Sequence, residues 1–373
     1  MPAKTAAMVK APGNSAEARN LERPVLPLSP FTPNVIRTRI GEAERLFKSR
    51  PRPTSLSPTS TDVVTLALLD RASGRLHQLS VSKQFFLVKN SEAMMMTSLG
   101  TQVTLRVVRA NGVNTAVTAV DAGGRSLTPL LVEFPIEKGG VFRETAYYTS
   151  AHPALLSPEL TLAGQAYVRS MVDMAAKRLQ EKGVIISPQI VDVAERLCLV
   201  EHVDHDRFRN ENRKALFDEI YSLYALNDLD TYRYSVSFAG AGGMVQMIPW
   251  AYNLERQRHP SVGLMTDFVN GMRTHSNALQ AMLLYMQDTW KELTASEDVQ
   301  LALANKTATP SEILAAGYNS NAAKLPSYLR RGGNGWRSLI PRETQMYLQI
   351  YKAVDSMVPM KSRTNALPGS KAE

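Results

Sequence analysis

The spacing of apolar residues along this chain changes near residue 150, and this change constrains the fold more than any other feature. From 62 to 150, short runs of β-branched and apolar residues, such as 63–69 and 102–108, indicate strands. After residue 151, apolar residues recur every three or four positions, as in amphipathic helices. The sequence therefore predicts an α+β multidomain chain, with a small antiparallel β domain at 62–150 and an all-α domain at 151–360.

Turn residues divide the β-like region into strands. Asn111-Gly112 separates the run at 102–108 from another at 113–120, which predicts a two-residue type I′ hairpin. Further strands are expected at 127–134 and 141–148. Five to seven strands in a small sandwich or barrel follow from this pattern. The region contains no catalytic constellation, and its ligand is unknown.

Three helices of the second region are marked by a hydroxyl residue followed by proline. This pattern, an N-cap and then proline at the first helical position, occurs at Ser157-Pro158, Ser187-Pro188 and Thr309-Pro310. Glu312 completes a capping box with Thr309. Further amphipathic helices are expected at about 213–226, 265–273, 277–293 and 343–357.

The two ends of the chain lack a periodic apolar pattern. Residues 1–61 hold nine of the 21 prolines and predict a disordered arm, in which 35–47 has the pattern of a short helix. Residues 361–373 predict a disordered tail. The first 20 residues contain no apolar stretch typical of a secretory signal.

Composition excludes some classes of protein and leaves others open. There is no run of eighteen apolar residues, so no integral membrane segment is expected. The net charge of +9 favours a polyanionic partner, such as nucleic acid, an anionic surface or peptidoglycan. The basic residues are dispersed, so nothing beyond net charge supports nucleic acid. The single cysteine, Cys198, lies in an apolar run and is interpreted as a buried structural thiol.

Glu201 is the carboxylate most suited to acid–base chemistry. In the helix expected from Pro188, Ile190, Ala194 and Leu197 share one face, and Glu201 continues that apolar stripe. A carboxyl group on a buried stripe is desolvated, which raises its pKa and favours the protonated form of a general acid. The alternative is that the helix ends at Val200 and Glu201 turns out to solvent.

A segment crowded with small residues lies at 237–249, with the sequence SFAGAGGMVQMIP. Small residues in a turn allow the backbone to approach another helix or an extended ligand closely. The segment predicts a short buried helix that is entered by a tight turn and closed by Pro249.

Together with Glu201, this segment resembles the transglycosylase SLT domain, a goose-lysozyme-like family that cuts peptidoglycan. The family has a helix ending in Glu, then S-x-x-G-A-x-G-L-M-Q-x-M-P, then A-x-Y-N, then E-T. The matching residues are Glu201; Ser237, Gly240, Ala241, Gly243, Gln246 and Pro249; Ala316, Tyr318 and Asn319; and Glu343 and Thr344. The resemblance covers about 185–355. Between Glu201 and Ser237 it requires a helical insert.

The resemblance implies a lysozyme-like helical domain and a lytic transglycosylase. In this family one Glu protonates the oxygen between N-acetylmuramic acid and N-acetylglucosamine, then takes the proton of the C6 hydroxyl as a 1,6-anhydro ring closes. Glu201 would be that residue. Tyr318 would hydrogen-bond it, and Asn319 would hold an N-acetyl sugar. Ser237, Gly240, Gln246 and Glu343 would bind substrate or support the site.

The same resemblance sets the expected context and leaves two alternatives open. No metal or organic cofactor is implied, the partner is the peptidoglycan glycan strand, and the location is the cell envelope or periplasm. One alternative is a goose-type muramidase that hydrolyses the same bond with water. The other is a catalytically inactive peptidoglycan-binding or scaffold protein.

Polar and aromatic residues after Glu201 have two interpretations each. His202 and His205 have the spacing of a metal pair, and Asp204 and Asp206 are candidates for a hydrolytic base, but a polar surface turn is favoured. In the insert, Phe217, Tyr221 and Tyr224 fall at helical spacing, which favours core packing over a glycan groove; the other insert aromatics are Phe208, Tyr232 and Tyr234.

Overall fold

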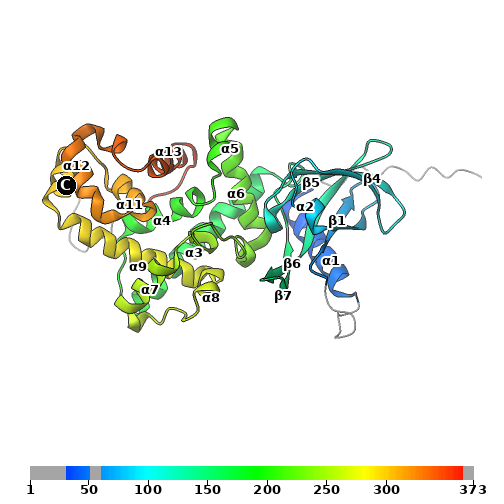
Figure 1. Ribbon diagram of the computed structural model, residues 1–373, viewed down its shortest axis with the longest axis horizontal. Coiled ribbons are helices and arrows are strands. Elements are labelled where there is room, and N and C mark those ends of the chain that lie inside the picture. The colour runs from blue at the N-terminus through cyan, green and yellow to red at the C-terminus, as the bar shows by residue number, and fades with distance from the viewer. Residues whose placement is uncertain (1–30, 51–59, 364–373) are drawn as a thin grey trace, which may run out of the picture.

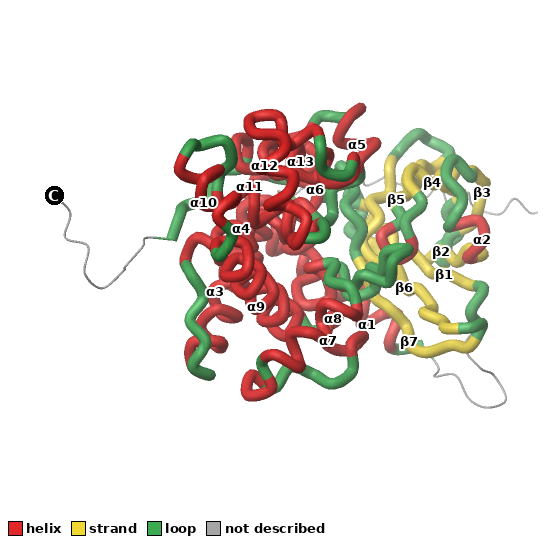
Figure 2. Tube along the Cα trace, turned by 60° about the vertical axis from the view of Figure 1, so that its left-hand side comes forward, coloured by secondary structure: helices red, strands yellow, loops and turns green. Residues whose placement is uncertain are grey.

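The computed structural model describes residues 31–50 and 60–363. Within these residues the chain is mixed α+β, with thirteen α-helices and one curled antiparallel sheet of seven strands. The sheet lies at one side of the molecule and most helices lie at the other (Figure 1). A view turned by 60° shows the same separation of strands from helices (Figure 2). None of the described helices combines the length and the apolar character needed to cross a bilayer.

The first described element is a helix that belongs to the folded body. Helix α1 (Pro33–Lys48) begins after Thr32, whose side chain accepts a hydrogen bond from the backbone N–H of Val35. Its buried residues Ile36, Ala43 and Phe47 pack against the sheet. The short helix expected at 35–47 is thus confirmed as α1, and the disordered arm expected over 1–61 does not include 31–50, because this helix has an apolar face to bury. Residues 1–30, 51–59 and most of the predicted tail (364–373) lie outside the described residues.

The sheet is built around one long strand. Its strands are β1 (Val63–Asp70), β2 (Arg75–Ser82), β3 (Glu92–Met96), β4 (Gln102–Arg109), β5 (Ala116–Asp121), β6 (Ser126–Lys138) and β7 (Val141–Tyr148). The order is β2-β1-β6-β5-β4-β3, and β7 also pairs with β6. Since β6 pairs with β5 near its start and with β1 and β7 further along, the sheet curls around its own apolar core.

Two details of the β region differ from the sequence prediction. The chain between β4 and β5 forms a short 3-10 turn at Gly112–Asn114, not a two-residue type I′ turn. Its geometry is set by Thr115, whose Oγ1 accepts from Asn111 N and donates to Gly112 O. Strands β2 and β3 were not predicted, because polar residues in β2 and the methionine-rich composition of β3 weaken the β pattern. The short helix α2 (Lys83–Phe86) connects them.

The helical region contains all seven helices expected from the sequence. These are α3 (Pro158–Glu181), α4 (Pro188–Val200), α6 (Arg213–Asn227), α8 (Phe268–Arg273), α9 (His275–Thr294), α11 (Pro310–Asn319) and α13 (Arg342–Met357). The capping box of Thr309 and Glu312 is formed, and Ser157 caps α3. Ser187 makes no side-chain cap hydrogen bond, so that part of the prediction is wrong. Helices α5 (His205–Asn210), α7 (Pro249–Arg258), α10 (Glu297–Ala304) and α12 (Leu325–Gly332) complete the region.

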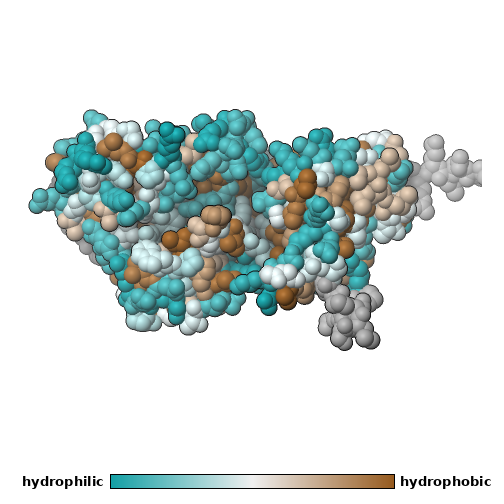
Figure 3. Space-filling model, viewed as in Figure 1, coloured by the Kyte–Doolittle hydropathy of each residue, from teal (hydrophilic) through white to brown (hydrophobic). Residues whose placement is uncertain are grey.

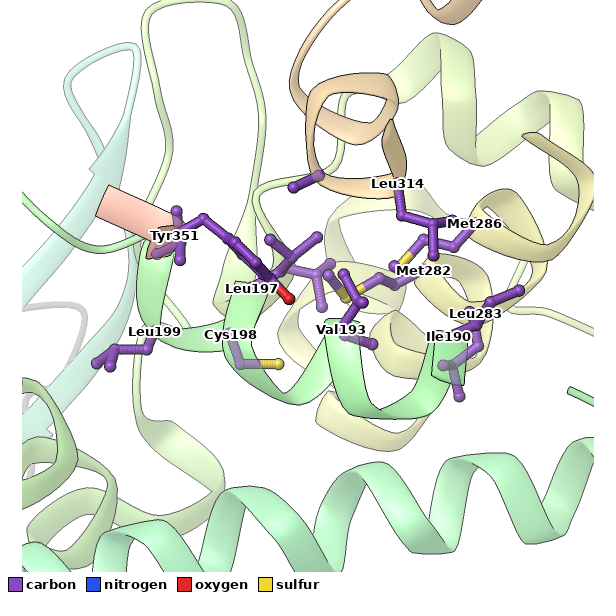
Figure 4. Packing of buried hydrophobic residues seen from close by; sticks show 14 of the residues in the cluster. Ile190, Val193, Leu197, Cys198, Leu199, Met282, Leu283, Met286, Leu314 and Tyr351 are labelled. Atoms are coloured by element: carbon purple, nitrogen blue, oxygen red, sulfur yellow. The ribbon is translucent and has the colours of Figure 1, made fainter. Parts of the chain in front are cut away.

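Helix α4 forms the centre of the helical core. It contacts α3, α9, α11 and α13, and nine of its thirteen residues are buried. Figure 4 shows Ile190, Val193 and Leu197 packed among methionine and leucine side chains of α9 and α11. Cys198 is fully buried, and burial raises the pKa of its thiol well above the usual range, which confirms a structural thiol. Because α4 is packed on several sides, its C-terminal end is held in a fixed position.

The insert after Glu201 connects the helices to the sheet. It contains α5 and α6, as the prediction of a helical insert required. Phe217, Tyr221 and Tyr224 are buried in the core, which confirms core packing over a groove role. At the C-terminal end of α6, Ala225 and Leu226 join the apolar cluster beneath the sheet. An ion-paired network of Arg109, Glu219 and Arg207 reinforces this junction.

Candidate functional site

A cleft of about 770 Å³ crosses the helical region. Its walls come from the end of α4, the segment 237–251, one face of α9, the end of α11 and the start of α13. Figure 3 shows apolar surface gathered around the hollow in the helical half of the molecule. Of the predicted site residues, Glu201, Ser237, Gln246, Tyr318, Asn319 and Glu343 all line this cleft.

Glu201 stands at the C-terminal cap of α4 and faces the cleft. The helix ends at Val200, as the alternative interpretation stated, but Glu201 keeps a helical backbone with φ −61° and ψ −16°. Its side chain is therefore not turned out to solvent; it lines the cleft. Its Oε1 accepts a hydrogen bond of 2.5 Å from the phenolic hydroxyl of Tyr347, on α13.

The surroundings of Glu201 favour its protonated form. Burial of the carboxyl group raises its pKa to about 8, the hydrogen bond from Tyr347 opposes this rise, and the charge of Glu343 adds to it. At neutral pH such a carboxyl group carries a proton and is able to donate it. Within the cleft, Glu201 thus has the protonation state of a general acid.

The hydrogen bond to Glu201 that the resemblance implied for Tyr318 is made by a different tyrosine. Tyr318 was expected to hydrogen-bond Glu201, but its hydroxyl donates to the carbonyl of Val245 at 2.6 Å. Its ring meets that of Tyr285 edge-on, with centroids 5.9 Å apart. The expected contact is made by Tyr347, which was not predicted. The sequence does contain a signal for Tyr347. It follows the predicted site residue Glu343 by four positions, so the two side chains lie on the same face of the helix.

The segment of small residues forms a compact turn before α7. Gly243 has φ +68°, and a Cβ there would lie 2.2 Å from the carbonyl oxygen of Met272. The prediction of a helix closed by Pro249 is wrong, because only Gly243–Val245 forms a 3-10 turn and Pro249 begins α7. Close approach of backbone, not helix formation, explains the small residues here.

Gln246 holds this segment in an uncommon backbone conformation. It lies in the left-handed region with φ 46° and ψ 41°. Its Nε2 donates to Gly243 O at 2.7 Å and to Ser235 Oγ at 3.1 Å. The side-chain NH₂ group therefore stabilises the turn, while the residue still lines the cleft.

Ser237 and Gly240 belong to the exposed turn at the edge of the cleft. Ser237 Oγ accepts a hydrogen bond from Ala241 N at 3.0 Å, and its hydroxyl hydrogen has no protein acceptor among the described residues. Gly240 has φ +78° with open space around it, and it does not line the cleft. Its contribution is to the shape of the turn.

Asn319 offers an unused hydrogen-bond acceptor at the end of α11. Its Oδ1 is buried and has no hydrogen-bond partner among the described residues, although the residue lines the cleft. Buried carbonyl oxygens of this kind normally accept a hydrogen bond. Asn319 can therefore accept one from an N–H group of a ligand.

Two further carboxylates line the cleft. Glu343, in the first turn of α13, is close enough to Glu201 to raise its pKa by charge repulsion. Glu292, on α9, pairs with Arg258 at 3.0 Å. Asp204 and Asp206 do not line the cleft: Asp204 caps α5, and Asp206 pairs with Arg209.

The histidines after Glu201 do not form a metal site in the described part of the chain. The ring of His202 stacks on Tyr232 with centroids 3.3 Å apart, and its Nε2 lies 3.0 Å from the carbonyl oxygen of Met244. Burial lowers the pKa of His202 to about 3, so the ring is neutral and donates to that carbonyl. This hydrogen bond ties His202, the residue after Glu201, to Met244 in the small-residue segment.

Exposed aromatic rings lie beside the cleft. Trp250, in the first turn of α7, lines it and is 66% exposed. Phe238 lies between the cleft residues Ser237 and Ala239 and has a fully exposed side chain. Two large apolar rings left in water at the edge of a cleft form a surface for an apolar face of a ligand.

Comparison of the chain with protein-family models, with curated proteins and with solved structures gives no match. The motif residues and the geometry of the cleft therefore carry the functional proposal.

Proposed function

We propose that the protein is a peptidoglycan lytic transglycosylase with a lysozyme-like helical domain. The observation that carries the proposal is Glu201, a carboxyl group that lines a cleft of about 770 Å³, has a raised pKa and accepts a hydrogen bond from Tyr347. Seven of the twelve motif residues that resemble the SLT family line the same cleft. Among them are Gln246, Tyr318 and Asn319.

In the proposed reaction Glu201 moves two protons in sequence. It first protonates the oxygen that leaves C1 of N-acetylmuramic acid, so the C1–O bond breaks and the N-acetylglucosamine hydroxyl departs. The resulting carboxylate then accepts the proton of the C6 hydroxyl, whose oxygen bonds to C1. Glu201 ends protonated, and the product is a 1,6-anhydro sugar. No water is consumed.

The remaining cleft residues have separate roles in this scheme. Asn319 Oδ1, which has no hydrogen-bond partner within 31–50 and 60–363, accepts the N–H of an acetamido group. Tyr347 stabilises the carboxylate form that exists between the two proton transfers. Trp250 packs against the C–H face of a sugar ring, and Glu343 keeps the resting carboxyl group protonated.

A muramidase that hydrolyses the same bond is the second candidate. The observation that favours it is Glu343, a carboxylate in the cleft near enough to Glu201 to affect its pKa. Hydrolysis by inversion needs a second carboxylate that activates water. Asp204 and Asp206 do not line the cleft, so Glu343 is the residue to test.

The test is digestion of purified peptidoglycan by wild-type protein and by Glu201→Gln, with products identified by mass spectrometry. Anhydro products from wild type, reduced about 1,000-fold or more in the variant, support the proposal. Reducing-end products identify a muramidase. If neither protein releases fragments while a control enzyme does, the enzymatic proposal fails. Sedimentation with intact sacculi would then support a binding or scaffold protein at the cell envelope.

A further inference from the structure

Three ligating side chains converge where α7 meets α9, outside the residues used above. Glu255 and His259 are one helical turn apart at the end of α7, and Asp288 lies on α9. One ligand atom from each lies within 4.8 Å of the others. His259 Nε2 is 2.8 Å from Asp288 Oδ2 and 3.6 Å from Glu255 Oε2.

Glu255 is the unusual member of this group. Its side chain is 0% exposed, and both carboxylate oxygens lack a hydrogen-bond partner among the described residues. Burial, together with the charge of Asp288, raises its pKa to about 7. A buried carboxyl group without partners is unfavourable unless a cation or a donor meets it.

The neighbouring basic side chains do not fill this need. Arg258 pairs with Glu292 at 3.0 Å, and it lies 3.8 Å from Asp288. Lys291 lies 3.7 Å from the other oxygen of Asp288. The two distances to Asp288 are longer than a charge-assisted hydrogen bond. The charge of Arg258 acts on Glu255, but neither Arg258 nor Lys291 makes a hydrogen bond to its oxygens.

The donor set selects a class of cation. Tetrahedral Zn²⁺ with ligand distances near 2.0–2.1 Å places its ligand atoms about 3.4 Å apart, and the observed 2.8 Å and 3.6 Å bracket that spacing. One imidazole and two carboxylates suit Zn²⁺ and similar transition ions better than Ca²⁺ or Mg²⁺, which prefer oxygen ligands. His259 and Asp288 are partly exposed, so a water molecule has access to the fourth position.

We infer that Glu255, His259 and Asp288 form a binding site for a divalent transition-metal ion of the Zn²⁺ type. The ion would join α7 to α9, and these two helices build one wall of the cleft. Leu254 and Arg258 of α7, and Thr289 and Glu292 of α9, are cleft-lining neighbours of the three ligands. The site is independent of the proposed reaction, because its ligands do not line the cleft.

The experiment is a titration of chelator-treated full-length protein with Co²⁺ and, in competition, Zn²⁺. We expect one equivalent of Co²⁺ to give the visible absorption of a tetrahedral site, and Zn²⁺ to displace it. Thermal unfolding should shift upward with metal concentration, because the ion binds the folded state. Glu255→Gln and His259→Gln should weaken binding at least 100-fold.

The matched control is Glu292→Gln, which removes a carboxylate one turn from Asp288 but outside the ligand set. It should bind the metal like wild type. Circular dichroism of metal-free Glu255→Gln establishes that this near-isosteric variant is folded. Absence of stoichiometric binding in wild type overturns the inference and leaves Glu255 as a buried neutral acid. Unchanged affinity in folded Glu255→Gln overturns it equally.

Discussion

The hydroxyl of Tyr347 lies 2.5 Å from Oε1 of Glu201, so α13 supplies the hydrogen-bond donor for a carboxyl group at the end of α4. The two residues are 146 positions apart in the chain. Through this contact α13 partly opposes the rise that burial causes in the pKa of Glu201.

Tyr347→Phe is predicted to move the pH profile of activity towards higher pH. The hydroxyl stabilises the charged form of Glu201, so its loss raises the pKa of that group further. The alkaline limb of kcat/KM reports loss of the acid proton and should shift upward, while the maximum falls about tenfold. The control is Tyr318→Phe, whose hydroxyl donates to Val245 O and should leave the limb in place.

Glu343→Gln is predicted to shift the same limb in the opposite direction. The charge of Glu343 raises the pKa of Glu201, so removing it lowers that pKa. Glu201 then loses its proton at a lower pH, and the alkaline limb moves down. Measurement of kcat/KM against pH for Tyr347→Phe and Glu343→Gln shows whether the two alkaline limbs move in opposite directions. A shift in the same direction for both would contradict the arrangement of charges described here.

Gly243→Ala is predicted to destabilise the fold by at least about 2 kcal/mol, because a Cβ meets Met272 O at 2.2 Å and the residue has positive φ. Urea unfolding measures the free-energy difference. Gly240→Ala is the control: its φ is also positive, but the space around it is open, so only the backbone cost of about 1 kcal/mol is expected. Equal losses for the two variants would exclude close packing as the cause.

Trp250→Ala is predicted to raise KM for glycan strands about tenfold with little effect on stability. The ring is 66% exposed and lines the cleft, so its removal takes contact area from the ligand and little from the core. Leu162→Ala, on an exposed face of α3 and not in the cleft lining, should change neither KM nor the melting temperature. An unchanged KM in Trp250→Ala would remove this ring from the glycan surface.

The sequence predicts the helices of this fold better than its turns. Helix N-termini at Pro158, Pro188 and Pro310 are local events, set by a hydroxyl residue and a proline, and all three are observed. The connection at 110–115 is also set by local contacts, but the Asn-Gly signal predicts a different turn from the one that Thr115 Oγ1 stabilises through Asn111 N and Gly112 O. Strand β3 is half-exposed, so its apolar pattern is weak.

For the site, the sequence indicates which residues reach the cleft but not how they pair. The burial of Glu201 is predicted by the apolar stripe that it continues, because such a stripe is a periodic signal in the sequence. The choice between Tyr318 and Tyr347 as its donor depends on how α11 and α13 pack against α4, which no local pattern contains. The group of Glu255, His259 and Asp288 has no signal in the sequence, because its third member is 29 residues from the second.

Helix α6 gives the sheet a mechanical connection to Glu201. One end of α6 is fixed beneath the sheet through Leu226, and from the same helix the hydroxyl of Tyr224 donates to the carbonyl of Cys198 at 2.9 Å. That carbonyl lies three residues before Glu201. Since Leu226 and Tyr224 are two residues apart on one helix, a single rigid element sets both the position of the sheet and that of the last turn of α4.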